Sequence, residues 1–451
     1  MLTIEERLAW WRDLGSPQTV CAPMVLQSEL AWRMLVRRHG VQLCYSPMLP
    51  AKAFVALPAD GDSIDPRTGG PATQAAYFTT CASDRPLAVQ LGGSDPQEML
   101  AAAKLVQDLG IDCIDLNFGC PQQCAQTGGY GAFLLTLPER AKALVDILVS
   151  GCKVPITAKI RILPDVRQPV LTLQCLLCPL FALIGLLSER WSWDRRRSIS
   201  HHLPPSPTFS HHLPPSPTFS QVADTVAFAR MLEDAGVAML TVHGRRREQR
   251  HHEGPASWEH IAAVKAALRI PVISNGNIQA PADVGACLEQ TACDGVMSAK
   301  GLLANPRIFA SWSSARGAGG VSSAGAVGGA SGDSSASGAS GDSGDAVGPP
   351  AAAASAPTRH ERSEMALEYL QCCVQYPQGC LPRMISDHLL EMLAPDLAMA
   401  FNAQEKKEIK DHRRTTRPQQ FASLVRRVQA NGAFHETTRR AARTPRPVSI
   451  E

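Results

Sequence analysis

The segment IDLNFGCPQQCAQTGGYGAFL, residues 114–134, starts as a short apolar run and continues as a loop rich in glycine and polar side chains. The same kind of run followed by turn residues recurs along residues 19–300. The runs are Thr19–Ala22, Gln42–Ser46, Leu87–Leu91, Cys113–Asn117, Ile156–Ile160, Met239–His243, Val272–Asn275 and Gly295–Ser298. Most intervals carry a helical pattern, for example Asp95–Leu109, Pro138–Val149, Ala223–Ala235 and Trp258–Leu268. Eight buried strands that alternate with helices predict an α/β fold, the (β/α)8 TIM barrel.

Polar side chains at the ends of these runs support the barrel independently. They are Gln90, Asn117, Lys159, His243 and Asn275. Each stands at or beside the carboxyl end of a predicted strand, which is where barrels of this kind build their active sites. Five polar groups at one end of one barrel predict a cofactor site, although His243 alone would be interpreted as an ordinary rim histidine.

The loop after the fourth run presents a thiol. Asn117 ends the strand, Gly119 allows a tight turn, and Cys120 is followed by Pro121. A Cys-Pro pair in a loop is more often structural than catalytic, and no accompanying His or Asn motif indicates a thiol protease. A neutral thiol with an unperturbed pKa of about 8.5 is suited to donating a proton as a general acid.

Three further loops at the same end predict a phosphate site. Ala22–Met24 (APM) follows the first strand, Asn275–Asn277 (NGN) the seventh, and Ser298–Gly301 (SAKG) the eighth. Glycine-rich loops after strands seven and eight that open onto a helix commonly hold phosphate in this fold, and the phosphate of flavin mononucleotide (FMN) fits there. Lys159 would then lie near a flavin carbonyl, and His243 near the phosphate or the ring.

Composition divides the chain into five parts. Residues 1–17 are a lead-in, and residues 18–312 form the predicted barrel. Residues 313–358, almost entirely Gly, Ala and Ser, predict a disordered linker. Residues 359–429 regain a helical pattern and predict a small all-α domain, and residues 430–451 predict a disordered basic tail.

Residues 167–220 interrupt the barrel between its fifth and sixth strands. They begin with the apolar stretch 170–187 and end in the tandem repeat SHHLPPSPTFSHHLPPSPTFS. The stretch just reaches transmembrane length, but it contains Gln174 and Pro179 and lies between consecutive strands of one barrel. We therefore interpret residues 167–220 as a disordered insertion foreign to the fold, such as retained intronic sequence. A genuine loop and a membrane contact are the alternatives, and we expect no membrane association.

The net charge of +3 is unevenly distributed along the 451 residues. Residues 401–451 contain 12 Lys and Arg against 5 Asp and Glu, which is +7 and leaves −4 for the rest of the chain. A basic end on a mildly acidic body points to nucleic acid or a membrane surface. Fourteen cysteines without a secretory signal predict reduced thiols in the cytoplasm, with the nucleus as the alternative. The spacing of these cysteines predicts no metal site.

Taken together, the motifs resemble the tRNA-dihydrouridine synthase family. The resemblance is carried by APM followed by QSELAWR, PLAVQL, DLNFGCPQ with GGYGAFL, AKIRI, TVHGR, SNGNI and GVMSAKG. QSELAWRML and QLCYSPML are most similar to the eukaryotic branch that acts at uridines 16 and 17 of the D-loop. The resemblance covers about residues 18–166, 221–312 and 360–429. It implies an FMN-containing barrel followed by a helical domain that helps to hold tRNA.

The resemblance also implies a reaction and its residues. NADPH reduces the flavin, the flavin delivers hydride to C6 of the uracil, and the loop cysteine, Cys120 here, protonates C5. The implied cofactor positions are Pro23, Met24, Gln90, Asn117, Lys159, His243, Asn275, Gly276, Asn277, Lys300 and Gly301. The chain departs from its relatives at Leu26, where they usually carry Asp, and at Gln126, Thr127 and Gly129.

The same interpretation assigns the basic residues to tRNA. The candidates are Arg245, Arg246, Lys406, Lys407, Lys410, Arg413, Arg414 and Arg417. We expect a monomer that binds tRNA and NAD(P)H. Two alternatives remain open: a flavin oxidoreductase acting on a free pyrimidine, and a tRNA-binding protein that has lost its activity.

Overall fold

The structure, a computed structural model, describes residues 1–59, 73–163, 219–250, 252–312, 356–414 and 417–443. The predicted linker at 313–358 lies outside these ranges except for its last three residues. The predicted insertion at 167–220 lies outside them except for its last two residues, and its apolar stretch 170–187 is not among the described residues. Among the helices of the described ranges, none is long and apolar enough to cross a membrane.

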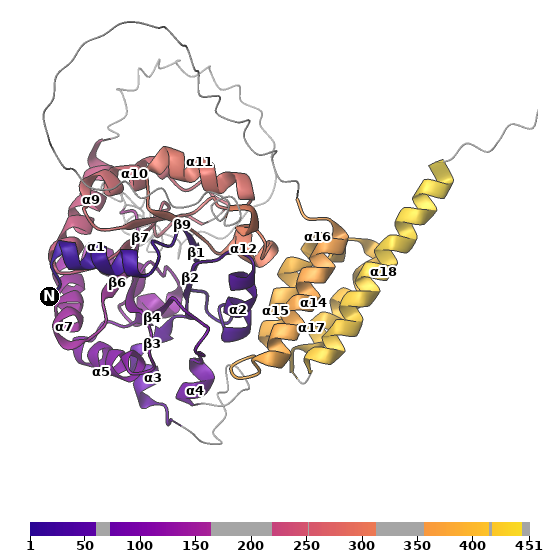
Figure 1. Cartoon of the computed structure of the whole chain (residues 1–451), viewed down its shortest axis with the longest axis horizontal. Helices are drawn as coiled ribbons and strands as arrows, with labels where there is room; N and C mark the ends of the chain where they lie inside the picture. Colours follow the sequence, from indigo (N-terminus) through magenta and orange to yellow (C-terminus); the bar gives the residue numbers. More distant parts are fainter. Residues whose placement is uncertain (60–72, 164–218, 251, 313–355, 415–416, 444–451) are drawn as a thin grey trace, which may run out of the picture.

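Parallel strands form a closed barrel (Figure 1). They are β1 (Thr19–Cys21), β2 (Leu43–Tyr45), β4 (Leu87–Gly92), β5 (Cys113–Phe118), β6 (Ile156–Arg161), β7 (Leu240–His243), β8 (Val272–Asn275) and β9 (Gly295–Ser298). Neighbours pair in sequence order, β9 returns to β1, and β2 pairs with β4. The short β3 (Leu49–Pro50) pairs only with β4. The predicted (β/α)8 barrel is confirmed, with β3 as an addition.

The barrel interior is filled by side chains that alternate along the strands. They form one apolar cluster with Trp11 of α1 (Ile4–Asp13), and its strand members include Leu43, Tyr45, Met239 and Met297. Residues on the opposite faces of the same strands pack against the surrounding helices in a second cluster. Burial on both faces explains why the strands read as continuous apolar runs. The predicted lead-in 1–17 therefore contains a helix that contributes to the core.

The helices around the barrel follow the predicted pattern. They are α2 (Leu30–Arg38), α3 (Ala51–Ala56), α4 (Gln74–Tyr77), α5 (Pro96–Gln107), α6 (Gln123–Thr127), the 3-10 helix η1 (Gly131–Thr136), α7 (Pro138–Gly151), α9 (Phe219–Asp234), α10 (Trp258–Ala267), α11 (Pro281–Thr291) and α12 (Lys300–Ala304). Leu163 and Thr225 flank residues 164–218 in the sequence, and the Leu163 N–H donates a hydrogen bond to Thr225 Oγ1 at 3.0 Å. This bond joins β6 directly to α9, as an uninterrupted barrel unit requires.

A second, all-helical domain follows the barrel, as predicted for residues 359–429. It consists of α14 (Arg359–Gln375), α15 (Pro382–Met392), α16 (Ala394–Leu397), η2 (Ala400–Asn402), α17 (Ala403–Asp411), η3 (His412–Arg414) and α18 (Pro418–Arg443). The prediction of disorder from residue 430 is wrong for residues 430–443, which continue α18. After Pro418 this stretch contains no further proline until Pro445, and Gly432 is its one glycine, so nothing in it ends a helix.

The two domains meet at a buried polar cluster (Figure 1 shows α14 and α15 beside α2). Glu29, at the N-terminus of α2, accepts a hydrogen bond from Tyr369 Oη at 2.7 Å and contacts His388 Nε2 at 3.2 Å. The His388 ring stacks on Trp32 with 4.3 Å between centroids. These contacts hold α14 and α15 against α2 of the barrel.

Candidate active site

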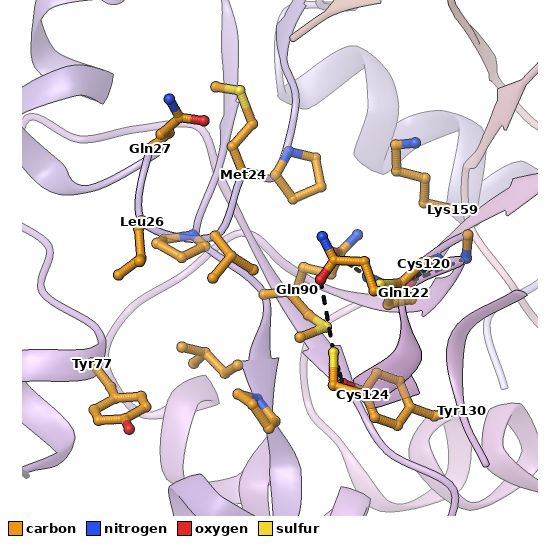
Figure 2. Close-up of a pocket in the computed structure, with 18 of the residues that line it drawn as sticks. Met24, Leu26, Gln27, Tyr77, Gln90, Cys120, Gln122, Cys124, Tyr130 and Lys159 are labelled. Carbon is orange, nitrogen blue, oxygen red and sulfur yellow. Dashed lines mark hydrogen bonds between the residues drawn. The ribbon is translucent and has the colours of Figure 1, made fainter. Parts of the chain in front are cut away.

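A cavity of about 670 Å³ opens at the carboxyl ends of the strands. Figure 2 shows Gln90, Cys120 and Lys159 on one part of its wall and Leu26, Gln27 and Tyr77 on another. Of the predicted site residues, it is lined by Pro23, Met24, Gln90, Asn117, Cys120 and Lys159. Residues far apart in the chain are thus brought together at the end of the barrel where they were predicted to meet.

Asn117 organises the loop that carries the thiol. Its side-chain oxygen accepts hydrogen bonds from the N–H groups of Gly119 at 3.0 Å and Cys120 at 2.9 Å. Its Nδ2 donates to Gln90 Oε1 at 2.8 Å, and Gln90 Nε2 donates to Asp115 Oδ2 at 2.8 Å. Because both ends of the Asn117 amide are engaged, this residue positions the loop.

Cys120 faces the cavity with its thiol half-buried. Burial raises the pKa of the thiol above its ordinary value, so the group stays protonated at neutral pH. Its carbonyl accepts a hydrogen bond from Ala132 N at 2.9 Å. Gly131 is held at φ +67°, where an added Cβ would lie 2.6 Å from the Cys120 carbonyl oxygen. Only glycine therefore fits where the chain passes beneath the thiol.

Lys159 brings an amine into the same cavity. Its Nζ donates to Asn275 Oδ1 at 2.9 Å, and Asn275 Nδ2 in turn donates to the Met297 carbonyl at 2.9 Å. Burial, with the positive charge of Arg161 added to it, lowers the pKa of Lys159 to about 7. An amine near its titration point in a recessed site is suited to hold an anion or a developing negative charge.

A buried carboxyl beneath these residues was not expected from the sequence. Asp115 is fully buried on β5, accepts from Thr157 Oγ1 at 2.7 Å, and supports Gln90. Burial raises its pKa to about 6. The alternation along β5, in which Asp115 and Asn117 share a face, was the available signal. Asp115 thus underlies the chain of hydrogen bonds through Gln90 and Asn117 to the Cys120 loop.

The glycine-rich loops after β8 and β9 are those that the sequence predicted to hold a phosphate. Gly276 has φ +119°, and an added Cβ there would lie 2.5 Å from Ala256 Cβ. Asn277 fixes the neighbouring backbone, since it accepts from Ala256 N and donates to Ala256 O, both at 2.8 Å. At Gly301, an added Cβ would lie 2.3 Å from the Ile278 carbonyl oxygen. This tight packing explains why glycine is required at both positions. Lys300, the other predicted cofactor residue of these loops, is exposed at the start of α12.

His243 and Arg245 line a neighbouring cavity of about 630 Å³. Burial, reinforced by the charges of Lys159 and Arg161, lowers the pKa of His243 well below its usual value, so its ring is neutral. Arg245 is only 8% exposed and donates to Asn277 Oδ1 at 3.1 Å and to the Gly254 carbonyl at 3.1 Å. Arg245 was predicted together with Arg246 as an RNA contact, but Arg246 alone of the two is exposed. Arg245 braces the glycine loop after β8 through Asn277, and its role as an RNA contact stays a prediction.

The basic residues predicted in the helical domain lie apart from the residues that line the first cavity. Lys407, Lys410, Arg413 and Arg417 are exposed, and Lys406 is half-buried. Arg413 pairs with Asp387 at 2.5 Å. Asp387 also lies 3.8 Å from Arg383, which does line the cavity. A string of charged side chains therefore leads from the exposed basic residues to the cavity mouth.

Several lining residues were missed by the sequence analysis. The helical domain contributes Leu381, Arg383 and Met384 from the start of α15, and the barrel adds Met48, Tyr77, Gln122, Cys124 and Tyr130. Cys124 accepts a hydrogen bond from Tyr130 Oη at 3.8 Å. Leu26, one of the positions at which the sequence departs from the family pattern, lines the cavity with φ +62°. Only the docking of the domains reveals the α15 residues, because no local pattern connects them to the barrel.

The fold and the cavity define a barrel protein with a ligand site at the carboxyl ends of its strands, shaped by a glycine-rich rim, a protonated thiol and a buried amine. The profile of the dihydrouridine synthase (Dus) family matches residues 20–171 and 220–319. The chain belongs to the dihydrouridine synthase family.

Curated relatives agree with this assignment. A tRNA-dihydrouridine(16/17) synthase [NAD(P)(+)]-like protein of Mus musculus is 39% identical over 68% of this chain and 50% of its own length. The tRNA-dihydrouridine(16/17) synthase [NAD(P)(+)] of Schizosaccharomyces pombe is 34% identical over 68% of this chain and 60% of its own. A human tRNA-dihydrouridine(20a/20b) synthase [NAD(P)+]-like protein is 32% identical over 66% and 72%. The chain thus spans 50 to 60% of the length of these two 16/17 relatives.

Proposed function

We propose that this chain reduces uridine to 5,6-dihydrouridine in the D-loop of tRNA, at positions 16 and 17, with FMN as resident cofactor and NADPH as reductant. The observation that carries the proposal is that the Cys120 thiol and the Lys159 amine line the same cavity. The proposed substrate suits a cytoplasmic or nuclear enzyme. The relatives named as 16/17 synthases support the choice of positions.

The residues present fit a flavin. The cavity offers an apolar wall from Pro23 and Met24 and polar groups from Gln90 and Lys159. Gly276 and Gly301 allow the loops after β8 and β9 to pack tightly, and loops of this kind after the last two strands of a barrel commonly hold a phosphate. When bound, the flavin supplies the hydride that adds to C6 of the uracil. Lys159, with its pKa of about 7, would stabilise negative charge on the ring by taking up a proton.

The chain's own residues would complete the reduction of the C5–C6 double bond. The Cys120 thiol donates its proton to C5 while hydride arrives at C6, so that one hydrogen is added to each carbon. The backbone of the Cys120 loop is held by Asn117, which limits the freedom of the Sγ. After each turnover the thiolate must regain a proton from water, which its raised pKa favours.

The uracil must leave its stack to reach this cavity, because the target carbons are inaccessible in a folded D-loop. The cavity is lined by both the barrel and α15, so an RNA segment would lie between the two domains. Exposed Lys407, Lys410 and Arg417 would then contact phosphates beyond the flipped base. This arrangement favours a polynucleotide substrate over a free pyrimidine, which needs no basic surface.

The test is dihydrouridine formation in an unmodified tRNA transcript with the purified full chain, FMN and NADPH, measured by mass spectrometry. Cys120→Ala should lower the rate by about a hundredfold or more while flavin content stays unchanged. Cys152→Ala is the matched control, because Cys152 is a half-buried free thiol that is not among the lining residues of the cavity. Full activity of Cys120→Ala would refute the proton-donor role, and absence of product at both positions from the wild-type protein would refute the proposed reaction.

A further inference from the structure

A buried chain of hydrogen bonds inside the barrel ends at the loop that carries the thiol. It begins on three neighbouring strands, where the register sets Gln90 of β4 opposite Asp115 of β5 and Asp115 opposite Thr157 of β6. Asp115 and Thr157 are fully buried, and Gln90 is only 1% exposed. Polar side chains at this depth must complete their hydrogen bonds with one another.

The chain has one direction, which begins at Asp115. An ionised carboxylate accepts hydrogen bonds but cannot donate them, and the pKa of about 6 keeps Asp115 ionised at neutral pH. Gln90 therefore turns its Nε2 toward Asp115, at 2.8 Å, and its Oε1 accepts from Asn117 Nδ2 at 2.8 Å. Asn117 Oδ1 is left for the N–H groups of Gly119 and Cys120, at 3.0 and 2.9 Å.

Other bonds hold the opposite side of the same loop. The Gly119 carbonyl accepts from Arg161 Nε at 2.8 Å, and the Cys120 carbonyl accepts from Ala132 N at 2.9 Å. The carbonyl groups of the loop are thus fixed independently of the chain, whereas its N–H groups are held by Asn117. Loss of the chain should therefore loosen the loop at the thiol without unfolding it.

Removal of the acceptor at position 115 would change the direction of the chain. Gln90 Nε2 would then be a buried donor without a partner, which is costly. The Gln90 amide gains a partner by turning over and donating to Asn117 Oδ1. That oxygen would be drawn away from the N–H groups of Gly119 and Cys120, so a change beneath the cavity would reach the thiol.

We propose that Asp115 is a positioning residue for the reaction, because its carboxylate fixes the direction of the Gln90–Asn117 chain and so holds the Cys120 thiol at the cavity wall. The inference rests on the proposed function for the role of Cys120 as proton donor. A general acid has to stay within hydrogen-bonding reach of the group that it protonates. Asp115 is fully buried and is not among the lining residues of the cavity, so it acts through its neighbours.

The first experiment measures how fast iodoacetamide alkylates Cys120 in the full-length protein, with and without added FMN, by peptide mass spectrometry. Asp115→Leu keeps the approximate size of the side chain and removes the acceptor. We expect Cys120 to react about fivefold faster or more, because the half-buried thiol becomes accessible. Asp115→Asn keeps an oxygen for Gln90, so its rate should stay within about twofold of the wild type.

Thr157→Val is the matched control. It removes the other hydrogen bond of the same carboxylate, from Thr157 Oγ1 at 2.7 Å, and leaves the link to Gln90 intact. Cys120 should then react as in the wild type. The half-buried thiol of Cys152 reports general loosening in every variant. If Thr157→Val accelerates Cys120 as much as Asp115→Leu does, or if Cys152 is accelerated equally, the proposal is wrong.

A second variant breaks the chain one link nearer to the loop. Gln90→Leu removes both hydrogen bonds of the amide and should also free Cys120, which keeps the test decisive if Asp115→Leu does not fold. An unchanged alkylation rate of Cys120 in the folded variants would overturn the proposal.

The second experiment measures dihydrouridine formation at varied tRNA concentration. Asp115→Leu should lower kcat about tenfold and change the KM for tRNA less than about twofold, because a misplaced thiol slows proton transfer and leaves RNA binding unaltered. Asp115→Asn should restore most of kcat. A raised KM with unchanged kcat would overturn the positioning role. If the wild type forms no dihydrouridine, the proposed function fails, whereas the alkylation rates still decide whether Asp115 holds the loop.

Discussion

At the scale of single residues, burial shifts the pKa of Lys159 far from the ordinary value of a lysine. An amine on a strand end is ordinarily charged up to about pH 10. Here burial, together with Arg161, lowers the pKa to about 7, while Asn275 accepts its hydrogen bond. The charged form is thus costly in this buried position, and a bound anion would stabilise it.

The pH dependence of stability tests this burial. Because the folded-state pKa of Lys159 lies below that of the unfolded chain, the unfavourable contribution is full below pH 7 and is relieved as the pH rises toward 10. We expect Lys159→Met to raise the melting temperature of the flavin-free protein more at pH 6 than at pH 9, by a difference of about 2 °C or more. Thermal melts of both proteins at the two pH values measure it. An equal shift at both values would contradict the lowered pKa.

Among the elements, the short helix α12 begins under a tight packing restraint. An added Cβ at Gly301 would lie 2.3 Å from the Ile278 carbonyl oxygen and 2.8 Å from Ser298 Oγ. A backbone oxygen cannot move aside as a flexible side chain can. The loop after β9 therefore depends on this glycine for its path.

A pair of glycine substitutions separates packing from helix propensity. Gly301→Ala should destabilise the protein by about 2 kcal/mol or more through overpacking and should reduce flavin retention. Gly285→Ala on α11 is the control, because an added Cβ there meets only the Trp312 ring at an ordinary 3.7 Å. We expect the control to be neutral or to stabilise by up to about 1 kcal/mol. Urea unfolding and flavin absorbance measure both variants, and equal effects of the two would show that the packing restraint is absent.

At the scale of the whole molecule, Glu29 joins the two domains. Burial raises its pKa and the contacts with His388 and Tyr369 lower it, and the net pKa lies below the ordinary value. The carboxylate therefore remains charged between two elements that are distant in the sequence. Because α15 lines the first cavity, this contact also fixes one wall of the site.

Substitution of Glu29 should show what this junction contributes. Glu29→Ala leaves Tyr369 Oη and His388 Nε2 buried without their acceptor and should cost about 3 kcal/mol of unfolding free energy. Tyr369→Phe removes one hydrogen bond and keeps the ring, so it should cost about 1 kcal/mol. Urea unfolding followed by circular dichroism compares them. If Glu29→Ala lowers the free energy of unfolding less than Tyr369→Phe does, the Glu29 carboxylate does not serve both Tyr369 and His388.

The basic surface of the helical domain leads to a prediction about tRNA binding. Replacing Arg413, Arg414 and Arg417 with Ala should weaken tRNA binding and reduce the slope of log K against log salt by about one for each lost phosphate contact. Flavin content should not change. Arg269→Ala is the control, because Arg269 is exposed before β8, at the opposite end of the barrel. If the slope of the salt titration is unchanged in the triple variant, these three arginines do not contact tRNA phosphates.

The barrel and its rim could be predicted because they depend on short-range patterns. Strands buried on both faces appear as apolar runs, and the side chain at each carboxyl end must face the same mouth of the barrel. Gln90, Asn117 and Lys159 were predicted for this reason, and they line one cavity. Of the other two strand-end residues, His243 lines the neighbouring cavity and Asn275 accepts the hydrogen bond of Lys159. The length of α18 was underestimated, because a basic, polar composition was interpreted as disorder although no proline interrupts it.

The sequence by itself determined the eight strands, the placement of Cys120 on its loop and the separation of charge between body and end. Only the tertiary structure decided which charges are recessed and which are exposed, so that Arg245 lies inside the site while Arg246 lies outside it. It also decided that α15 completes the cavity and that Asp115 supports Gln90. The physical reason is that burial and ion pairing depend on neighbours brought together across hundreds of residues, whereas strand and helix periodicity depends on residues only a few positions apart.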